Sequence, residues 1–275
     1  MALSVNTNLY SLNAQRNVAS SQANLGASMQ RLSSGLRVNS AKDDAAGLAI
    51  AERMNAQVKG ISVAIRNAND AISMSATAEG ALSKVTDSLQ RMRELAVQSA
   101  NASVNDGDRA NLDAEYQQLG AEITRVLDST KFNGQAILGA DSGTLTFQVG
   151  ANSDDTIDIT TSDMTADADV TAVTGGGITS AADATSAMDD IDTALDAVSL
   201  ERANYGAYQN RFESVIGNLQ VSQENTSAAR GRIVDADFAS ETANLSRGQI
   251  LQQAGMAMLT QANAMPQQVL SLLRG

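Results

Sequence analysis

Three residue types that carry much protein chemistry are missing: the 275-residue sequence has no cysteine, no histidine and no tryptophan. The first two absences exclude thiol and imidazole nucleophiles, Ser-His-Asp triads, histidine-based zinc sites and disulfide bonds. With only four Phe and four Tyr, the core must be built from Ala, Leu, Ile, Val and Met, which suits closely packed helices. We expect no catalytic site, no metal site and no cofactor.

Positive charge is missing from one long segment. Residues 141–200 hold twelve Asp and no Lys, Arg or Glu, so they account for the whole formal charge of −12. Because the rest of the chain is neutral, we expect neither nucleic acid nor an anionic membrane as a partner. No apolar run reaches membrane-spanning length, and the N-terminus lacks the pattern of a cleaved signal peptide. Composition alone indicates a cytoplasmic protein or one exported without such a signal.

The segment 245–273 predicts a long helix with an unusual surface. Between Arg247 and Arg274 no residue is charged, whereas a solvated amphipathic helix normally carries Lys and Glu. Apolar residues recur along it at steps of three and four, namely Leu251, Ala254, Met258, Ala262, Met265, Val269 and Leu272. Burial among other helices suits such a segment best, so we expect it to need partners.

The first segment, 1–36, is chemically similar. Its only charged residues are Arg16 and Arg31, and heptad steps are taken by Val5, Leu9, Leu12, Leu25, Met29, Leu32 and Leu36. We predict that the two terminal segments pair as a two-helix coiled coil, which brings both chain ends together.

The interior predicts three further helices. One runs over 44–101, with Gly60 and Gly80 as tolerated weak points, and Ser40 with Asp43 indicates a capping box before it. A second follows a turn at 105–108 that also supplies its N-cap. The third covers about 187–229, where Arg202 and Gln209 fall on the heptad stripe and indicate polar contacts that fix the register.

Helical periodicity stops in between. Residues 131–134 predict a turn, and alternation over 145–159 predicts a β-hairpin. Asp154, Asp155 and Asp158 lack the pattern of a calcium loop, so a solvated turn is the better interpretation. Residues 161–186 have low complexity and little apolar content, and we expect a linker or small surface excursion. The whole predicts a mainly α fold: an elongated antiparallel helical coiled-coil rod with a small β-hairpin region at its tip.

Several motifs resemble those of bacterial flagellins. In chain order they are RLSSGLRVNSAKDDAAGLAI at 31–50, QRMRELAVQSAN at 90–101, KFNG at 131–134, FESVIGNL at 212–219, GRIVDADF at 231–238 and QVLSLLR at 268–274. The resemblance covers roughly 1–150 and 187–275.

The resemblance implies an inner coiled-coil domain from 1–40 with 236–275, and an outer helical domain from 41–160 with 187–235. Residues 161–186 then stand as a short acidic excursion in place of a larger outer domain. It implies a structural subunit that polymerises into the extracellular flagellar filament for swimming. Export unfolded through the flagellar type III pathway, and contacts with an export chaperone and with hook-filament junction and cap proteins, follow from the same resemblance. Assembly is expected to bury a set of terminal-helix residues: Leu9, Leu25, Leu32, Leu251, Met258, Met265, Val269 and Leu272.

Many flagellins also present a helix face to Toll-like receptor 5. The residues that match this patch are Gln90, Arg91, Leu95, Gln98 and Glu115. They can equally serve as ordinary subunit-contact residues, and both roles are compatible because the patch overlaps a filament contact in this family.

Three other classes of protein share part of this pattern. A hook-filament junction protein shares the terminal heptads but is disfavoured by the full motifs at both ends. A metalloprotease insert, which some flagellins carry, needs an H-E-x-x-H helix that a chain without histidine cannot supply. An intracellular coiled-coil scaffold would show charged e and g positions rather than uncharged terminal helices.

Overall fold

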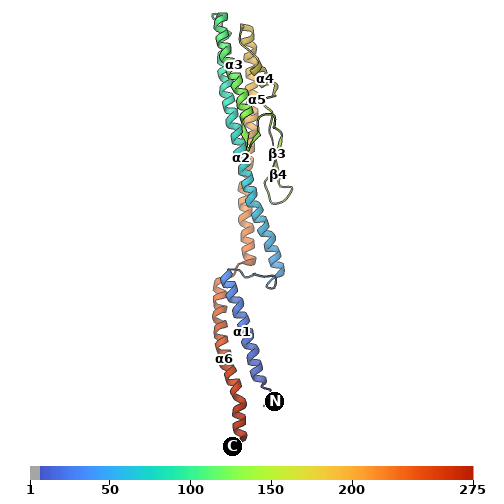
Figure 1. Cartoon of the computed structure of the whole chain (residues 1–275), viewed down its shortest axis with the longest axis vertical. Coiled ribbons are helices and arrows are strands. Elements are labelled where there is room, and N and C mark those ends of the chain that lie inside the picture. The colour runs from blue at the N-terminus through green and yellow to red at the C-terminus, as the bar shows by residue number, and fades with distance from the viewer. Residues whose placement is uncertain (1–6, 275) are drawn as a thin grey trace. The chain divides into compact units, whose positions relative to one another are not determined.

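The computed structural model describes residues 7–274, with side chains as far as Met265. Within them the chain is mainly helical, as predicted, and the strands are short (Figure 1). The helices are α1 (Leu9–Ser34), α2 (Ala45–Ser99), α3 (Asp106–Ser129), α4 (Ala168–Gly175), α5 (Ala181–Val234) and α6 (Phe238–Arg274). The strands are β1 (Lys131–Phe132), β2 (Gln135–Ala136), β3 (Thr144–Gln148) and β4 (Thr156–Thr160).

Packing divides the chain into two compact units. We call Met1–Ala56 with Asn225–Gly275 the terminal unit, and Gln57–Glu224 the central unit. The finer division into inner and outer domains that the resemblance implies stays a prediction.

Side-chain caps set where the helices begin. The side chain of Asn105 accepts a hydrogen bond from the amide of Asp108 (2.9 Å), which confirms the predicted N-cap of α3. The prediction for α2 is wrong in its detail: Asp44 Oδ1 accepts from the amide of Gly47 (2.8 Å), so Asp44 caps the helix. Ser40 and Asp43 do bond each other, but they close the turn that precedes it.

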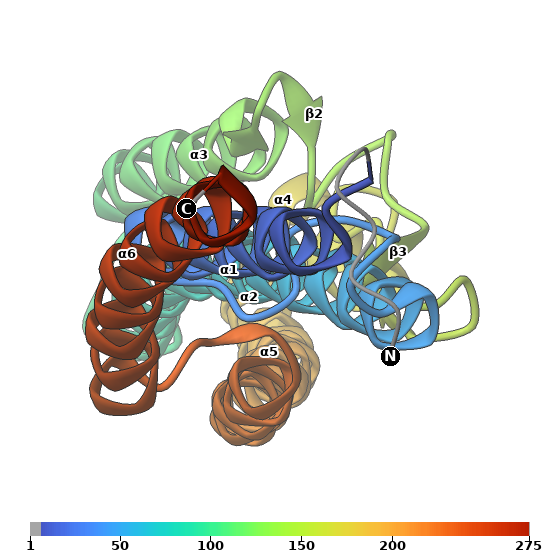
Figure 2. The same cartoon turned by 90° about the horizontal axis from the view of Figure 1, so that it is seen from below.

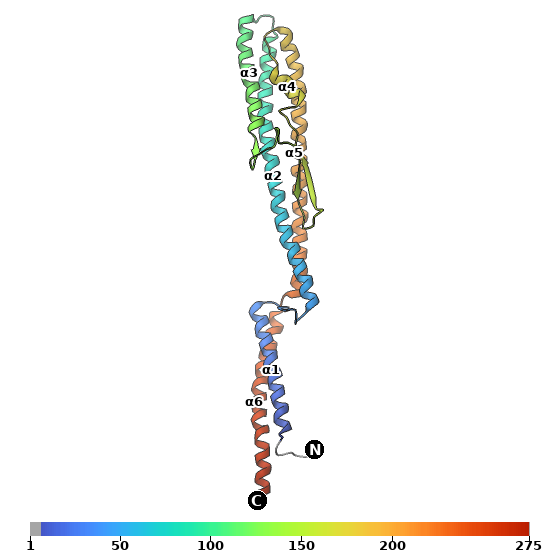
Figure 3. The same cartoon turned by 45° about the vertical axis from the view of Figure 1, so that its right-hand side comes forward.

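The terminal unit is built on the predicted pairing of the two end helices. α1 and α6 lie antiparallel and side by side, with Cα atoms that approach within 8 Å (Figures 1 and 3). A small cluster of Val38, Ala51 and Val234 closes the unit beyond the end of α1. There Leu36 forms a β-bridge with Asp235.

The central unit has its core among α2, α3 and α5, which run as neighbouring columns (Figures 2 and 3). Its largest fully buried side chains include Tyr116, Tyr205 and Phe212. The predicted polar contact on the α5 stripe is confirmed for Arg202, whose Nη2 donates to Glu79 Oε1 of α2 (2.8 Å). Two further α2–α5 hydrogen bonds join Arg93 and Asp192.

Both predicted β features are present in the central unit. β1 and β2 flank a turn in which Asn133 (φ 51°) and Gly134 (φ 86°) take left-handed conformations. β3 and β4 pair antiparallel, with Leu145 opposite Ile159.

The β3–β4 hairpin lies along the side of the helices, so its predicted place at a tip is wrong. Phe147 stacks edge-on against Phe212 of α5, with ring centroids 5.9 Å apart. The side chain of Asn67 in α2 donates to the carbonyl of Gln148 (2.9 Å). These partners hold the hairpin against the middle of α5 and the first part of α2 that belongs to this unit.

The expectation that residues 161–186 form a surface excursion is also wrong. The segment contains α4, and Met164, Val170, Val173 and Ile178 are all buried in the core. The four large apolar residues of this acidic stretch face inward, while Asp167 caps α4 by accepting from the amides of Asp169 and Val170. Low apolar content therefore did not mean exposure.

Candidate assembly surface

Small residues let α1 and α6 approach closely in the terminal unit. Their seam, defined here by buried or half-buried heptad positions, comprises Ser11, Ala14, Val18, Ser21, Leu25, Ser28 and Leu32 of α1 with Glu241, Leu245, Gly248, Gln252, Gly255, Leu259 and Ala262 of α6. Most of these side chains are short or polar, so the seam buries little large apolar surface.

Two glycines decide the approach distance. A Cβ atom added at Gly255 would lie 2.7 Å from Val18 Cγ2, and one added at Gly248 would lie 3.2 Å from Leu25 Cδ1. The two glycines stand seven residues apart, one heptad, and thus on the same face of α6. They are structural residues that the sequence analysis missed, although their spacing was a usable signal.

Hydrogen bonds fix the register at the open end of the pair. Ser11 Oγ bonds Asn263 Oδ1 at 2.7 Å, and Asn8 Nδ2 donates to the carbonyl of Ala262 at 2.7 Å. Asn8 also caps α1 through the amide of Ser11. The uncharged amide and hydroxyl groups of the two helices thus bond each other directly.

Many large apolar side chains of the pair nevertheless lie outside this seam. Leu9 is 65% exposed, Leu251 51% and Met258 64%. Others that remain exposed are Tyr10, Leu12, Met29, Ile250, Met256 and Met265. Single exposed apolar residues are ordinary, but a series of them along two neighbouring helices marks an interaction surface.

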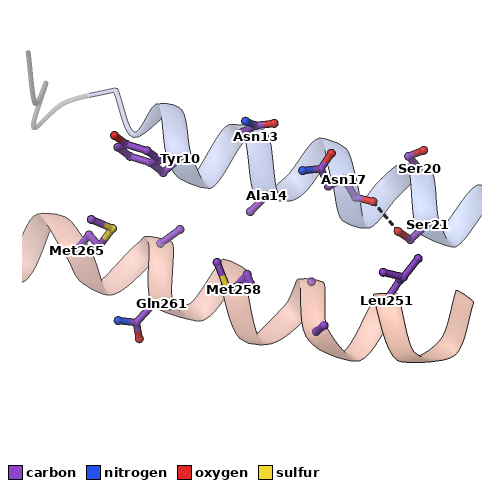
Figure 4. Close-up of a pocket in the computed structure, with 13 residues that line it drawn as sticks. Tyr10, Asn13, Ala14, Asn17, Ser20, Ser21, Leu251, Met258, Gln261 and Met265 are labelled. Carbon is purple, nitrogen blue, oxygen red and sulfur yellow. Dashed lines mark hydrogen bonds between the residues drawn. The ribbon is translucent and has the colours of Figure 1, made fainter. Parts of the chain in front are cut away.

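A groove of about 600 Å³ follows one face of the pair (Figure 4). Asn13, Asn17 and Ser21 line it from α1, and Leu251, Met258 and Met265 line it from α6. Figure 4 shows Met258 and Met265 on the side of α6 that faces α1. The α1 wall is mainly polar, with Tyr10 and Ala14 added, and the α6 wall is mainly apolar, with Gln261 added. No lining residue is charged, which matches the chemistry of the two terminal helices themselves.

The eight residues predicted for assembly do not share one surface. Leu25 and Leu32 are half-buried at the seam, whereas Leu9, Leu251, Met258 and Met265 are exposed. The side chains of Val269 and Leu272 lie outside the described residues. The stripe through Leu251 and Met258 is therefore not the seam with α1. In a single chain these side chains stay exposed to solvent.

The predicted receptor patch lies in the central unit. Arg91 donates to Glu115 Oε1 through Nε (3.0 Å) and Nη2 (2.8 Å), and through Nη1 to Glu94 (2.8 Å). These bonds, with that of Glu94 first, raise the pKa of Arg91. Gln90, Gln98 and both pair members are exposed.

Leu95, however, is 1% exposed and belongs to the core, so its assignment to a surface patch is wrong. Its neighbour Val97 is exposed, and it lines a shallow hollow together with Gln90, Arg93 and Glu94.

The acidic turn of the β3–β4 hairpin has an internal role. Asp155 Oδ2 accepts from the amide and the side chain of Asn152 at 3.1 and 3.0 Å.

Over the described part of the chain, no group of three or more acidic, His or Cys residues is placed to hold a metal ion. Over the same part, the helices include none with the length and hydropathy of a membrane span.

The terminal helices α1 and α6 pair with each other and leave an apolar face exposed. This arrangement defines a helical structural protein whose interaction surface is formed by its two terminal helices. Residues 5–142 match the family described as bacterial flagellin N-terminal helical region, and residues 188–273 match bacterial flagellin C-terminal helical region. The chain is 48% identical over 270 residues to a flagellin of Halalkalibacterium halodurans, covering 98% of this chain and 99% of that one. It is 40% identical over 283 residues to flagellar filament core protein flaB2 of Brachyspira hyodysenteriae, covering 98% and 99%.

Two solved structures are similar. The crystal structure of Bacillus cereus flagellin has a TM-score of 0.51 and 31% identity, covering 60% of this chain and 94% of that one. A putative flagellar hook-associated protein from Vibrio parahaemolyticus has a TM-score of 0.59, 16% identity and coverage of 70% and 100%. This second likeness shows the fold alone, so a junction protein gains no support from it.

The chain belongs to the bacterial flagellin family. It is a structural subunit of the extracellular flagellar filament, as the sequence motifs predicted.

Proposed function

We propose that this subunit polymerises through the exposed apolar face of the α1–α6 pair. The observation that carries this proposal is the split within the pair: most seam residues are small or polar, while Leu251 and Met258 stay exposed in one chain. Burying one such side chain stabilises a contact by roughly 1.5–3 kcal/mol. A second copy offers matching uncharged helices, which is why we name it as the occupant of the groove.

Sedimentation with electron microscopy after addition of a polymerising salt tests the proposal. The intact chain is expected to form filaments, and a chain truncated after Ser240 is expected to stay in the supernatant. The sharper variant is Leu251→Gln with Met258→Gln, which makes the groove wall polar without deleting the helix. Val221→Gln, which changes a residue 57% exposed in the central unit, is the matched control. Filaments from the double variant at the parent's threshold concentration would refute the proposal.

We further propose that the terminal helices gain most of their stability on assembly. A pair whose seam is mostly small or polar, with its leucines only half-buried, buries too little apolar surface to hold two long helices firmly. Amide exchange on monomer and filament tests this, with fast exchange over 250–270 expected in the monomer. Strong protection there before assembly would contradict it.

The remaining inferences concern partners and export. We propose export through the flagellar type III pathway without a cleaved signal, in an unfolded state held by an export chaperone, with growth between junction and cap proteins. We assign the chain no catalytic role, since filament formation needs none. Deleting the flagellar export apparatus in the source bacterium should retain the chain inside the cell, and secretion that persists would contradict this route.

A second candidate role is recognition by Toll-like receptor 5. The observation that favours it is the exposed Arg91–Glu115 pair, flanked by Gln90 and Gln98. Arg91→Ala is expected to weaken receptor signalling. Arg125→Ala removes an arginine that is exposed and paired within α3 to Glu122, and it is the control. An Arg91→Ala protein that signals as strongly as the parent would contradict this role.

A further inference from the structure

The described methionines fall into an exposed group in the terminal unit and a buried group in the central unit, with one half-buried methionine in each unit, Met54 and Met188. In the terminal unit Met29, Met256, Met258 and Met265 are all exposed, Met258 the most at 64%. In the central unit Met74, Met92 and Met164 are at most 3% exposed. Thioether oxidation follows access to the sulfur, so the two groups should differ sharply in reactivity.

Two of the exposed methionines line the groove of the α1–α6 pair. Met258 and Met265 lie on its α6 wall and are joined there by Leu251, with Tyr10 across the groove on α1 (Figure 4). Met256 is 51% exposed, between Met265 and Met258, but does not line the groove. Exposed methionines therefore lie both inside the proposed contact and outside it, so the effect of oxidation at the two places can be compared.

We propose that Met258 and Met265 form an oxidation-sensitive modification site that controls assembly, with a peroxide as the oxidant. The sulfur lone pair attacks one peroxide oxygen, an S–O bond forms, the O–O bond breaks and water leaves. Sulfur loses two electrons and the peroxide gains them. The product, methionine sulfoxide, is polar and chiral, so the apolar wall of the groove is lost.

Oxidation at this site depends on whether the subunit has already assembled. The inference rests on the proposed function, because a groove filled by another copy shields both sulfurs from the oxidant. Oxidation therefore acts on subunits before assembly, and finished filament is protected. Sulfoxide is reversible by methionine sulfoxide reductases, so a damaged subunit can regain its ability to assemble.

The test treats purified monomer with hydrogen peroxide, removes the peroxide and measures sulfoxide by peptide mass spectrometry. The dose is set where Met74, Met92 and Met164 stay unoxidised. Sulfoxide is expected at Met258 and Met265, and the critical concentration for salt-induced filaments is expected to rise about tenfold or more, the loss expected for one buried side chain. Preformed filaments given the same dose should show far less sulfoxide at these two positions.

Leucine variants separate this site from other exposed methionines. Leucine conserves volume but cannot form a sulfoxide. Each variant is compared with itself, treated against untreated. Met258→Leu with Met265→Leu should show a ratio of critical concentrations near one, whereas Met256→Leu should keep the sensitivity of the parent.

The outcomes distinguish the two proposals. A parent that carries both sulfoxides yet assembles like untreated protein overturns the inference, as does a leucine double variant that loses assembly as much as the parent. Suppose that one of these two results is found and that untreated Leu251→Gln with Met258→Gln fails to assemble. The proposed contact then stands, and only the oxidation inference fails. If that untreated variant assembles normally, the proposed contact itself has failed.

Discussion

Gly255 of α6 lies directly against Val18 of α1, so that a Cβ at position 255 would fall 2.7 Å from Val18 Cγ2. Carbon atoms in proteins do not approach so closely, and Val18 is too short and branched to swing aside. The close pairing of the two end helices thus depends on the absence of one side chain.

Gly255→Ala is therefore expected to weaken the α1–α6 pair by about 1–3 kcal/mol, offset by at most about 1 kcal/mol of improved helix propensity. Faster amide exchange in α1 and α6 of the assembled protein is the measurement. Gly26→Ala is the control, since a Cβ there meets nothing within 4 Å and the same propensity gain should slow exchange. Equal behaviour of the two variants would mean that the glycine is not needed for close approach.

Asp44→Ala should destabilise the start of α2 by about 1 kcal/mol, the usual cost of a lost N-cap. Its Oδ1 accepts from the amide of Gly47, and alanine leaves that donor without the carboxylate. Urea unfolding followed by circular dichroism measures the loss. Asp44→Asn keeps an acceptor and should retain most of the stability. A loss as large with asparagine would point to charge rather than to the cap.

The sequence predicted the helices well because their periodicity is long and uninterrupted. It placed α2, α3 and the pairing of the two ends correctly, since period and polarity suffice for those. It could not place the seam, because Leu251 and Met258 look like core residues by hydropathy. The seam uses Gly248 and Gly255 instead, and close backbone approach is a property of two helices that no single stripe reveals.

Two other errors have related physical causes. Residues 161–186 look like a solvated linker because Thr, Ala, Asp and Gly make up most of them, yet four large apolar residues anchor the segment in the core. Leu95 fits the receptor pattern by position along α2 but falls on the buried face, which only the packing of the central unit decides.

Gly60→Ala should loosen the β3–β4 hairpin from α2. An added Cβ would lie 2.9 Å from the Cβ of Ala151, in the turn of the hairpin. We expect the Asn67–Gln148 hydrogen bond to break and the amides of β4 to exchange faster. Gly80→Ala, at an open position of the same helix, should instead stabilise it by up to about 1 kcal/mol. Unchanged exchange in the Gly60 variant would show that the turn can move aside freely.

Tyr116 should make the central unit sensitive to alkali. Burial, and then the charges of Asp190 and Asp113, raise the pKa of Tyr116 to about 12, while its hydroxyl donates to the carbonyl of Val173. Because this pKa lies above the ordinary value of about 10, the neutral phenol favours the folded state. That contribution is complete below pH 10 and is lost as pH rises from about 10 to 12. Subtracting the ultraviolet phenolate titration of Tyr116→Phe from that of the parent isolates the group, and a midpoint near pH 10 would contradict its burial.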